Sequence, residues 1–165
     1  MRVVLGCSLL ALVACAQRDL SAPAPLGQLD EPYFRCKVQP ILVARCSFLA
    51  CHGDPGRPYR LFARQQLRLG VPPRDRGIAL TEAETRANYS ATLGFALQGL
   101  GEDADPLLLS KPLDEDGGGL FHRGREMYRG PDVFASRDDV DYRTLAAWVG
   151  GEKADPGCPD PGNLP

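Results

Sequence analysis

Histidine, methionine and tryptophan are scarce in this chain, which contains two, two and one of them among its 165 residues. Any imidazole ligand must therefore come from His52 or His122. Basic residues are not in excess either: 19 lysines and arginines against 21 aspartates and glutamates give a net charge of −2. This argues against nucleic-acid binding, which requires a basic face. Strand patterns are weak and no internal repeat is present, while 18 glycines and 15 prolines predict long loops.

Long apolar runs are absent apart from Val3–Val13, which is too short to cross a bilayer as a permanent helix. The run leads into Leu12-Val13-Ala14-Cys15, which resembles a bacterial lipobox, where the cysteine is lipidated and becomes the new N-terminus. We predict that residues 1–14 are a lipoprotein signal peptide. Cys15 would then anchor the protein to a membrane of the bacterial cell envelope, at its periplasmic or outer-membrane face. An ordinary signal peptide that happens to contain a cysteine is the alternative.

Of the six cysteines, Cys7 leaves with the predicted signal peptide and Cys15 carries the lipid, and the other four fall into two pairs. Cys36 and Cys158 lie near the two ends of the folded region, in an oxidising compartment where disulfides persist, and we predict that they bond to each other. Cys46 and Cys51 lie close together in a separate motif. A disulfide between these two, with no cofactor, is the rival pairing.

The motif is Cys46-Ser-Phe-Leu-Ala-Cys51-His52, and it predicts covalent attachment of a c-type haem. Four residues separate the thiols instead of the usual two, but a histidine still follows the second cysteine directly. The two thiols can add across the haem vinyl groups, and His52 then ligates the iron as the proximal ligand. Such a protein carries electrons, with no catalytic residues of its own. A zinc site built on the same three residues and one more ligand is a weaker alternative, because adjacent Cys51 and His52 would reach one tetrahedral ion only with strain.

The second axial ligand must come from a loop that reaches the other haem face. His122, in the glycine-rich run that begins at Gly117, is the favoured candidate, and Met127 is the alternative. A methionine sulfur would raise the potential of the iron relative to a second histidine. An open or water-bound position is the third option. Guanidinium groups pair well with haem propionates, and one or two of the arginines after the motif are expected to do so: Arg57, Arg60, Arg64 and Arg68.

Helical patterns occur in three segments. Pro40 suits the first turn of a helix that leads into the motif. Thr81–Leu97 opens with the capping box Thr81-x-x-Glu84, and a last helix is predicted to open at Ser136-x-x-Asp139 and to end at Gly150-Gly151. A helical turn is expected at 105–110. The residues expected on the packed faces are Val38, Ile41 and Leu42 in the first helix, Ala83, Ala87, Ala91 and Phe95 in the second, and Tyr142, Leu145, Ala146 and Val149 in the last. We expect the first and last helices to pack together, with Trp148 as a core residue beside them.

Taken together, residues 36–151 resemble the cytochrome c-like domains of exported lipoproteins and multidomain proteins in planctomycetes and myxobacteria. The stretches that carry the resemblance are, in chain order, Lys37-Val-Gln-Pro-Ile-Leu42, the motif with Gly53, Pro106-Leu-Leu-Leu-Ser-Lys-Pro112, Gly-Gly-Gly-x-x-His122 and the run from Asp138 through Trp148 to Gly151. The resemblance implies a mainly α, cytochrome c-like domain with long loops around one covalent haem c, which exchanges electrons with redox partner proteins. It further favours His122, since a glycine-flanked histidine recurs in that family.

The chain is thus predicted to contain a signal peptide (1–14), a lipidated cysteine with a flexible tether (15–32), a cytochrome c-like domain (33–158) and a short tail (159–165). Two other functions stay open. One is a haemless, disulfide-stapled envelope lipoprotein with an interaction or structural role. The other is a haem peroxidase-type enzyme, for which the sequence offers no distinct acid or base.

Overall fold

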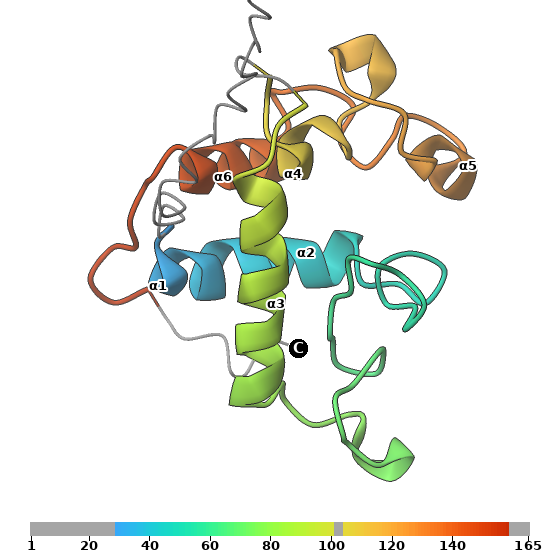
Figure 1. Ribbon diagram of the computed structural model, residues 1–165, viewed down its shortest axis with the longest axis vertical. Helices are drawn as coiled ribbons and strands as arrows, with labels where there is room; N and C mark the ends of the chain where they lie inside the picture. Colours follow the sequence, from blue (N-terminus) through green and yellow to red (C-terminus); the bar gives the residue numbers. More distant parts are fainter. Residues whose placement is uncertain (1–28, 101–103, 159–165) are drawn as a thin grey trace, which may run out of the picture.

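Helices form the frame of the protein in the computed structural model, which describes residues 29–100 and 104–158 (Figure 1). No β-sheet forms in these residues, where backbone pairing of the strand type is limited to isolated bridges. The prediction of a small, mainly helical domain with long loops is therefore confirmed. The predicted signal peptide, Cys15, most of the tether and the tail at 159–165 lie outside the described residues. Within the described part, no helix is both long and apolar enough to cross a membrane.

The first helical segment runs through α1 (Glu31–Tyr33), a π-helical turn, η1 (Phe34–Val38), and α2 (Gln39–Arg45). The π turn has a local cause in Pro40, whose ring would clash with the carbonyl four residues earlier and which has no N–H to donate. The chain widens there, and the Gln39 N–H donates to the Phe34 carbonyl, five residues back. Helix α2 then proceeds with Pro40 in its first turn and buries Ile41 and Leu42, as the sequence predicts.

The folded region begins earlier than residue 33, the predicted start of the domain. The Asp30 side chain caps α1 by accepting from the Tyr33 N–H at 2.7 Å, and it also accepts from the Ala154 N–H at 3.2 Å. The Leu29 carbonyl accepts from the Tyr89 hydroxyl at 2.6 Å. Residues 29–32 therefore pack on the domain and are not part of a free tether.

Helix α3 (Glu82–Ala96) opens with the predicted capping box, because Thr81 and Glu84 exchange both hydrogen bonds. The predicted packed face is wrong at Ala83, which is exposed, while Ala87, Ala91 and Phe95 are half-buried. The buried side chains are instead mostly polar: Glu84, Thr85, Asn88, Thr92 and Ala96. They are buried because they have partners far away in the sequence. Asn88, for example, exchanges two hydrogen bonds of 2.8 Å with the backbone of Phe62.

Helix α6 (Val140–Val149) ends at Gly150 as predicted, but its start differs. Asp139 is the N-cap, and its carboxylate accepts from the N–H groups of Asp141 and Tyr142. The predicted cap at Ser136 is wrong. Asp139, which the sequence pattern placed three residues inside the helix, is itself the cap. Aspartate is as good an N-cap as serine.

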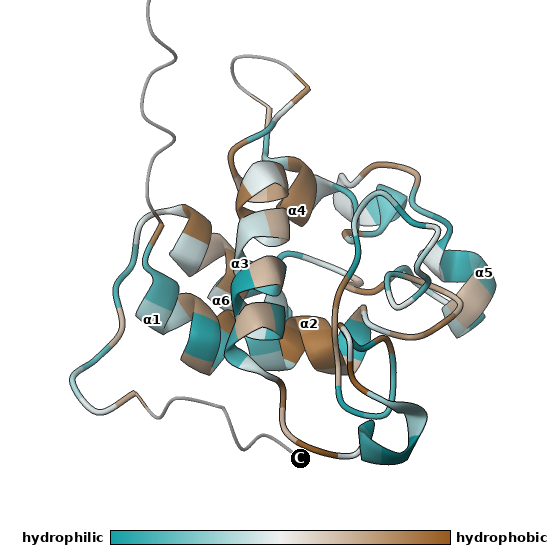
Figure 2. Ribbon diagram, turned by 60° about the horizontal axis from the view of Figure 1, so that its bottom comes forward, coloured by the Kyte–Doolittle hydropathy of each residue, from teal (hydrophilic) through white to brown (hydrophobic). Residues whose placement is uncertain are grey.

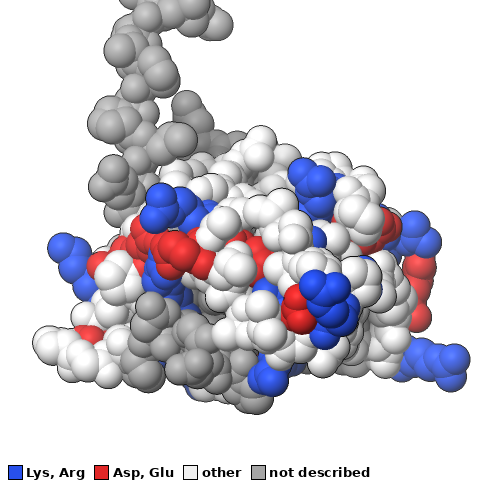
Figure 3. All heavy atoms as spheres, turned by 90° about the horizontal axis from the view of Figure 1, so that it is seen from below, with Lys and Arg blue, Asp and Glu red and all other residues white. Residues whose placement is uncertain are grey.

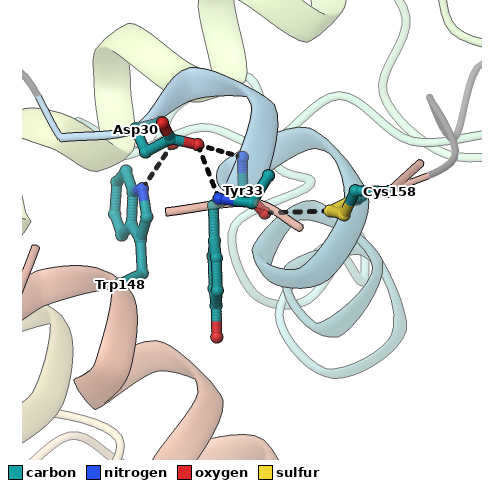
Figure 4. The surroundings of a disulfide bond; sticks show 6 residues. Asp30, Tyr33, Trp148 and Cys158 are labelled. Carbon is teal, nitrogen blue, oxygen red and sulfur yellow. Dashed lines mark hydrogen bonds between the residues drawn. A yellow bond between two sulfur atoms is a disulfide. The ribbon is translucent and has the colours of Figure 1, made fainter. Parts of the chain in front are cut away.

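The first and last helical segments pack together as expected, with Trp148 fully buried between them. Its ring centroid lies 5.3 Å from that of Phe34, and its indole N–H donates to the Asp30 carbonyl at 2.8 Å (Figure 4). The predicted disulfide between Cys36 and Cys158 is confirmed, with 5.9 Å between their Cα atoms. The disulfide joins the first helical segment to the irregular segment that follows α6.

Shorter elements and loops complete the domain. Helix α4 (Leu107–Ser110) forms at the predicted turn, and two 3-10 turns lie at η2 (Pro73–Asp75) and η3 (Glu115–Gly117). Helix α5 (Gly124–Tyr128), which the sequence did not predict, lies well away from α3 (Figure 1). Hydrophobic residues are prominent on α2 and α4 (Figure 2). Acidic and basic side chains are interspersed on the face seen in Figure 3, which accords with the small net charge.

Candidate functional site

The cysteine motif begins where α2 ends. Cys46 is the C-cap of α2, and its carbonyl accepts from the His52 N–H at 3.0 Å, so the four residues between the cysteines close into a compact loop. The Cys51 and Gly53 N–H groups both donate to the Phe48 carbonyl. Gly53 has to be a glycine, because a Cβ there would lie 2.0 Å from the Ser47 carbonyl oxygen. The longer spacer is thus accommodated by a folded turn, and both cysteines and the histidine stay together.

The His52 ring is fixed by one hydrogen bond to the main chain. Its Nδ1 lies 3.0 Å from the Tyr59 carbonyl oxygen, and because a carbonyl only accepts, Nδ1 carries the proton and donates. Nε2 is left unprotonated and free to ligate a metal, which is the arrangement that metal-binding histidines show. Burial lowers the pKa of His52, and the nearby His122 and Arg57 contribute in the same direction, so the neutral form is favoured.

His122 is held in the same way by a different group. Its Nδ1 lies 3.1 Å from Oδ1 of Asp132, a buried carboxylate that can only accept when ionised. The Gly124 N–H donates to the other oxygen of Asp132 at 3.1 Å. Nε2 of His122 is therefore also free. Sequence reasoning missed Asp132, because an aspartate in an irregular loop ten residues from the histidine has no recognisable pattern.

The two imidazoles face each other although 70 residues separate them in the sequence. Their ring centroids are 5.9 Å apart, and their planes differ by only 15°. The structure thus brings the two histidines that the sequence predicts as ligands close together, with their ring planes nearly parallel.

Two adjoining cavities lie beside these rings and share Cys46, His52, Arg57 and His122 in their walls. The smaller has a volume of about 210 Å³ and is also lined by Cys51. The larger has about 330 Å³, and together they fall within the range of small-molecule and cofactor sites. The larger cavity is walled by apolar side chains from four helices and the loop that carries His122: Leu42, Phe95, Leu108, Phe134 and Leu145. Phe95 is the one member of the predicted α3 face that contributes to this wall.

Cys46 and Cys51 carry free thiols, so the rival prediction of a disulfide between them is wrong. Burial raises the pKa of Cys46 to about 12, and burial also raises the pKa of Cys51. Both groups therefore remain protonated at neutral pH.

Met127 and the four arginines predicted near the haem differ in whether they line the two cavities. Met127 lies on α5, lines the smaller cavity and has 52% of its surface exposed. Among the four arginines, Arg57 alone lines either cavity. Arg68 is committed elsewhere, in a buried ion pair with Glu84. Arg60 and Arg64 are exposed and donate to nearby carbonyls of their own loop.

Within residues 29–100 and 104–158, no group of three or more His, Cys, Asp or Glu residues is arranged to hold a metal ion. The four-ligand zinc alternative needs such a group and has no support there. A haem iron takes only two ligands from the protein, so this finding does not bear on haem. Comparison with protein-family models, curated proteins and solved structures finds no match to this chain. The resemblance to cytochrome c-like domains therefore rests on the sequence motifs alone.

Proposed function

We propose that this protein is a lipid-anchored c-type cytochrome with a cytochrome c-like fold, which carries electrons in the bacterial cell envelope through one haem c. Cys46 and Cys51 form thioether bonds to the haem, and His52 and His122 ligate its iron from opposite faces. The observation that carries the proposal is the close pair of imidazoles beside the cysteine motif, with centroids 5.9 Å apart and each Nδ1 engaged by an oxygen.

A haem, when bound, supplies one-electron chemistry at its iron. The protein contributes the surroundings. The apolar wall of the larger cavity excludes water, and the hydrogen bonds to Nδ1 of His52 and His122 fix the tautomers that leave Nε2 available. Arg57 lines both cavities and has no acidic partner among the described residues, so its guanidinium is available to a propionate.

Export to the envelope is supported by the disulfide between Cys36 and Cys158, since such bonds persist in oxidising compartments. The lipobox-like run that ends at Cys15 then supplies the anchor. Redox partner proteins in the same compartment would donate and accept the electron.

The proposal is tested by expressing the full chain in a bacterium with haem-maturation machinery and recording the reduced-minus-oxidised spectrum. A low-spin spectrum is expected, and His122→Ala should convert the iron to high spin. Met127→Ala is the matched control and should leave the spectrum unchanged. If Met127→Ala has the effect and His122→Ala does not, the ligand assignment is wrong. A colourless protein would favour the haemless lipoprotein, and a high-spin wild type would favour a peroxidase-type enzyme.

A further inference from the structure

The loop that carries His122, residues 113–134, is closed at its base. Leu113 and Phe134 form an isolated parallel bridge, and both side chains are fully buried. The Asp114 N–H donates to the Phe134 carbonyl at 2.9 Å, and the Phe134 N–H donates to the Pro112 carbonyl at 3.0 Å. The histidine is therefore carried by a loop whose two ends are pinned together in the core, even though the loop itself contains little regular structure.

Inside this loop, the carboxylate of Asp132 is held by the main chain on both of its oxygens. Oδ1 accepts from the Val133 N–H at 2.7 Å, and Oδ2 accepts from the Gly124 N–H at 3.1 Å. Its other bond goes to Nδ1 of His122, and its side chain is only 6% exposed. A Cβ on residue 124 would lie 1.8 Å from Oδ1 of Asp132. Because Gly124 has no side chain, the carboxylate can occupy that space.

A second buried carboxylate supports the first. Asp114 accepts from the Asp132 N–H at 2.8 Å and from the Asp116 N–H at 2.9 Å. The guanidinium of Arg125 donates to both oxygens of Asp114 and neutralises it. The backbone at Asp132 is thus fixed as well as its side chain, and the orientation of the imidazole follows from both.

The two imidazoles therefore differ in the group behind them. His52 donates to a neutral carbonyl, that of Tyr59, whereas His122 donates to the carboxylate of Asp132. An anionic acceptor makes a stronger hydrogen bond than a neutral one and shifts more electron density onto the imidazole. A carboxylate behind a ligating histidine raises the basicity of that ligand.

We propose that Asp132 is a positioning residue for the distal haem ligand, which fixes the ring of His122 through its Nδ1 and strengthens Nε2 as a donor to the iron. This inference rests on the proposed function. A stronger donor stabilises the oxidised iron, so Asp132 lowers the midpoint potential of the protein. It also makes the two axial ligands inequivalent, with the distal one the stronger donor.

The test is the midpoint potential of Asp132→Asn in the haem-loaded full chain, measured by optical titration. An upward shift is expected, because asparagine keeps the size of the side chain and removes its charge. Glu115→Gln is the matched control. It removes the same charge from the same loop, but its side chain is exposed and does not touch His122, so its potential should equal that of the wild type. Equal potentials for Asp132→Asn and Glu115→Gln would overturn the inference.

A second measurement needs no variant and covers the case in which Asp132→Asn does not fold. In the reduced wild-type protein, the Nδ1 proton of His122 should resonate downfield of the Nδ1 proton of His52, because its acceptor is charged. Equal chemical shifts would contradict the inference. Failure of the proposed function gives a different result. The wild type would then hold no haem, or the iron of the His122→Ala variant would stay low-spin.

Discussion

Glu84→Gln should be the most damaging single substitution in α3. The side chains of Arg68 and Glu84 are 1% and 0% exposed, and two guanidinium nitrogens of Arg68 lie 2.8 Å from the two carboxylate oxygens. The other N–H groups of Arg68 donate to the carbonyls of Arg76, Ile78 and Ala79. The arginine therefore cannot turn to solvent without releasing the loop that it holds, and the substitution leaves a buried cation without its counter-ion.

Removing one partner of a buried ion pair costs about 3–5 kcal/mol, which is a large part of a total stability of about 5–15 kcal/mol. Glu126→Gln is the matched control, because its pair with Arg123 has side chains that are 57% and 67% exposed. A pair of that kind contributes under about 1 kcal/mol. With an m-value of about 2 kcal/mol per molar urea, the midpoint of urea unfolding should fall by roughly 2 M in Glu84→Gln and by less than about 0.5 M in the control.

Far-UV circular dichroism follows the unfolding by urea. Equal midpoints in the two variants would refute this account of the buried pair. If Glu84→Gln does not fold, the double variant Arg68→Leu with Glu84→Leu decides the matter. Removing both charges should recover part of the loss, because no unpaired ion is then buried. A double variant as unstable as the single one would show that the charges are not the cause.

The same pair predicts how stability depends on pH. Burial by itself raises the pKa of Glu84, but the hydrogen bonds from Arg68, Thr81 and Leu69 outweigh it and hold the pKa at about 2. The carboxyl of an unfolded chain has a pKa of about 4.3. The contribution of the ionised Glu84 to the free energy of unfolding is therefore fully present above about pH 4.3 and is lost as the pH falls toward 2. The difference in unfolding free energy between the wild type and Glu84→Gln should narrow across that interval, and a constant difference from pH 7 to 2.5 would contradict the ion pair.

Two further substitutions test the site and the frame. Gly53→Ala should reduce the fraction of chains that carry haem after denaturation, because its Cβ would lie 2.0 Å from the Ser47 carbonyl oxygen and would open the loop of the motif. Gly94→Ala, where a Cβ meets nothing within 4 Å, is the control and should load haem normally. Replacing Cys36 and Cys158 together by serine removes a cross-link over 122 residues, which the chain-entropy model values at about 5 kcal/mol. Thermal unfolding measures the loss, and an unchanged melting temperature would show that the bond does not stabilise the fold.

Local signals in the sequence predicted the frame well. The Thr81 and Glu84 capping box, Pro40 in a first turn and Gly150 at a helix end each act within one turn of chain, and all lie where predicted. The pairing of Cys36 with Cys158 followed from composition and compartment, without any knowledge of the path between them.

What the sequence did not reveal depends on distant partners. Thr92 and Glu84 are polar residues that look solvent-exposed in a helical pattern, yet both are buried because Tyr59 and Arg68 meet them from another loop. The same limit applies at the site. The positions of the two histidines were predicted as a ligand pair, but the carboxylate of Asp132 became visible only when the 113–134 loop was seen to fold back on itself.

The central claim is that a haem is bonded to the chain at Cys46 and Cys51, and peptide mass spectrometry tests it most directly. Protein made with haem-maturation machinery is denatured, stripped of free haem and digested with trypsin. The account predicts that the peptide beginning at Cys46 carries the mass of one haem and contains no free thiol. A peptide of unmodified mass with both thiols free to react with an alkylating agent would contradict it.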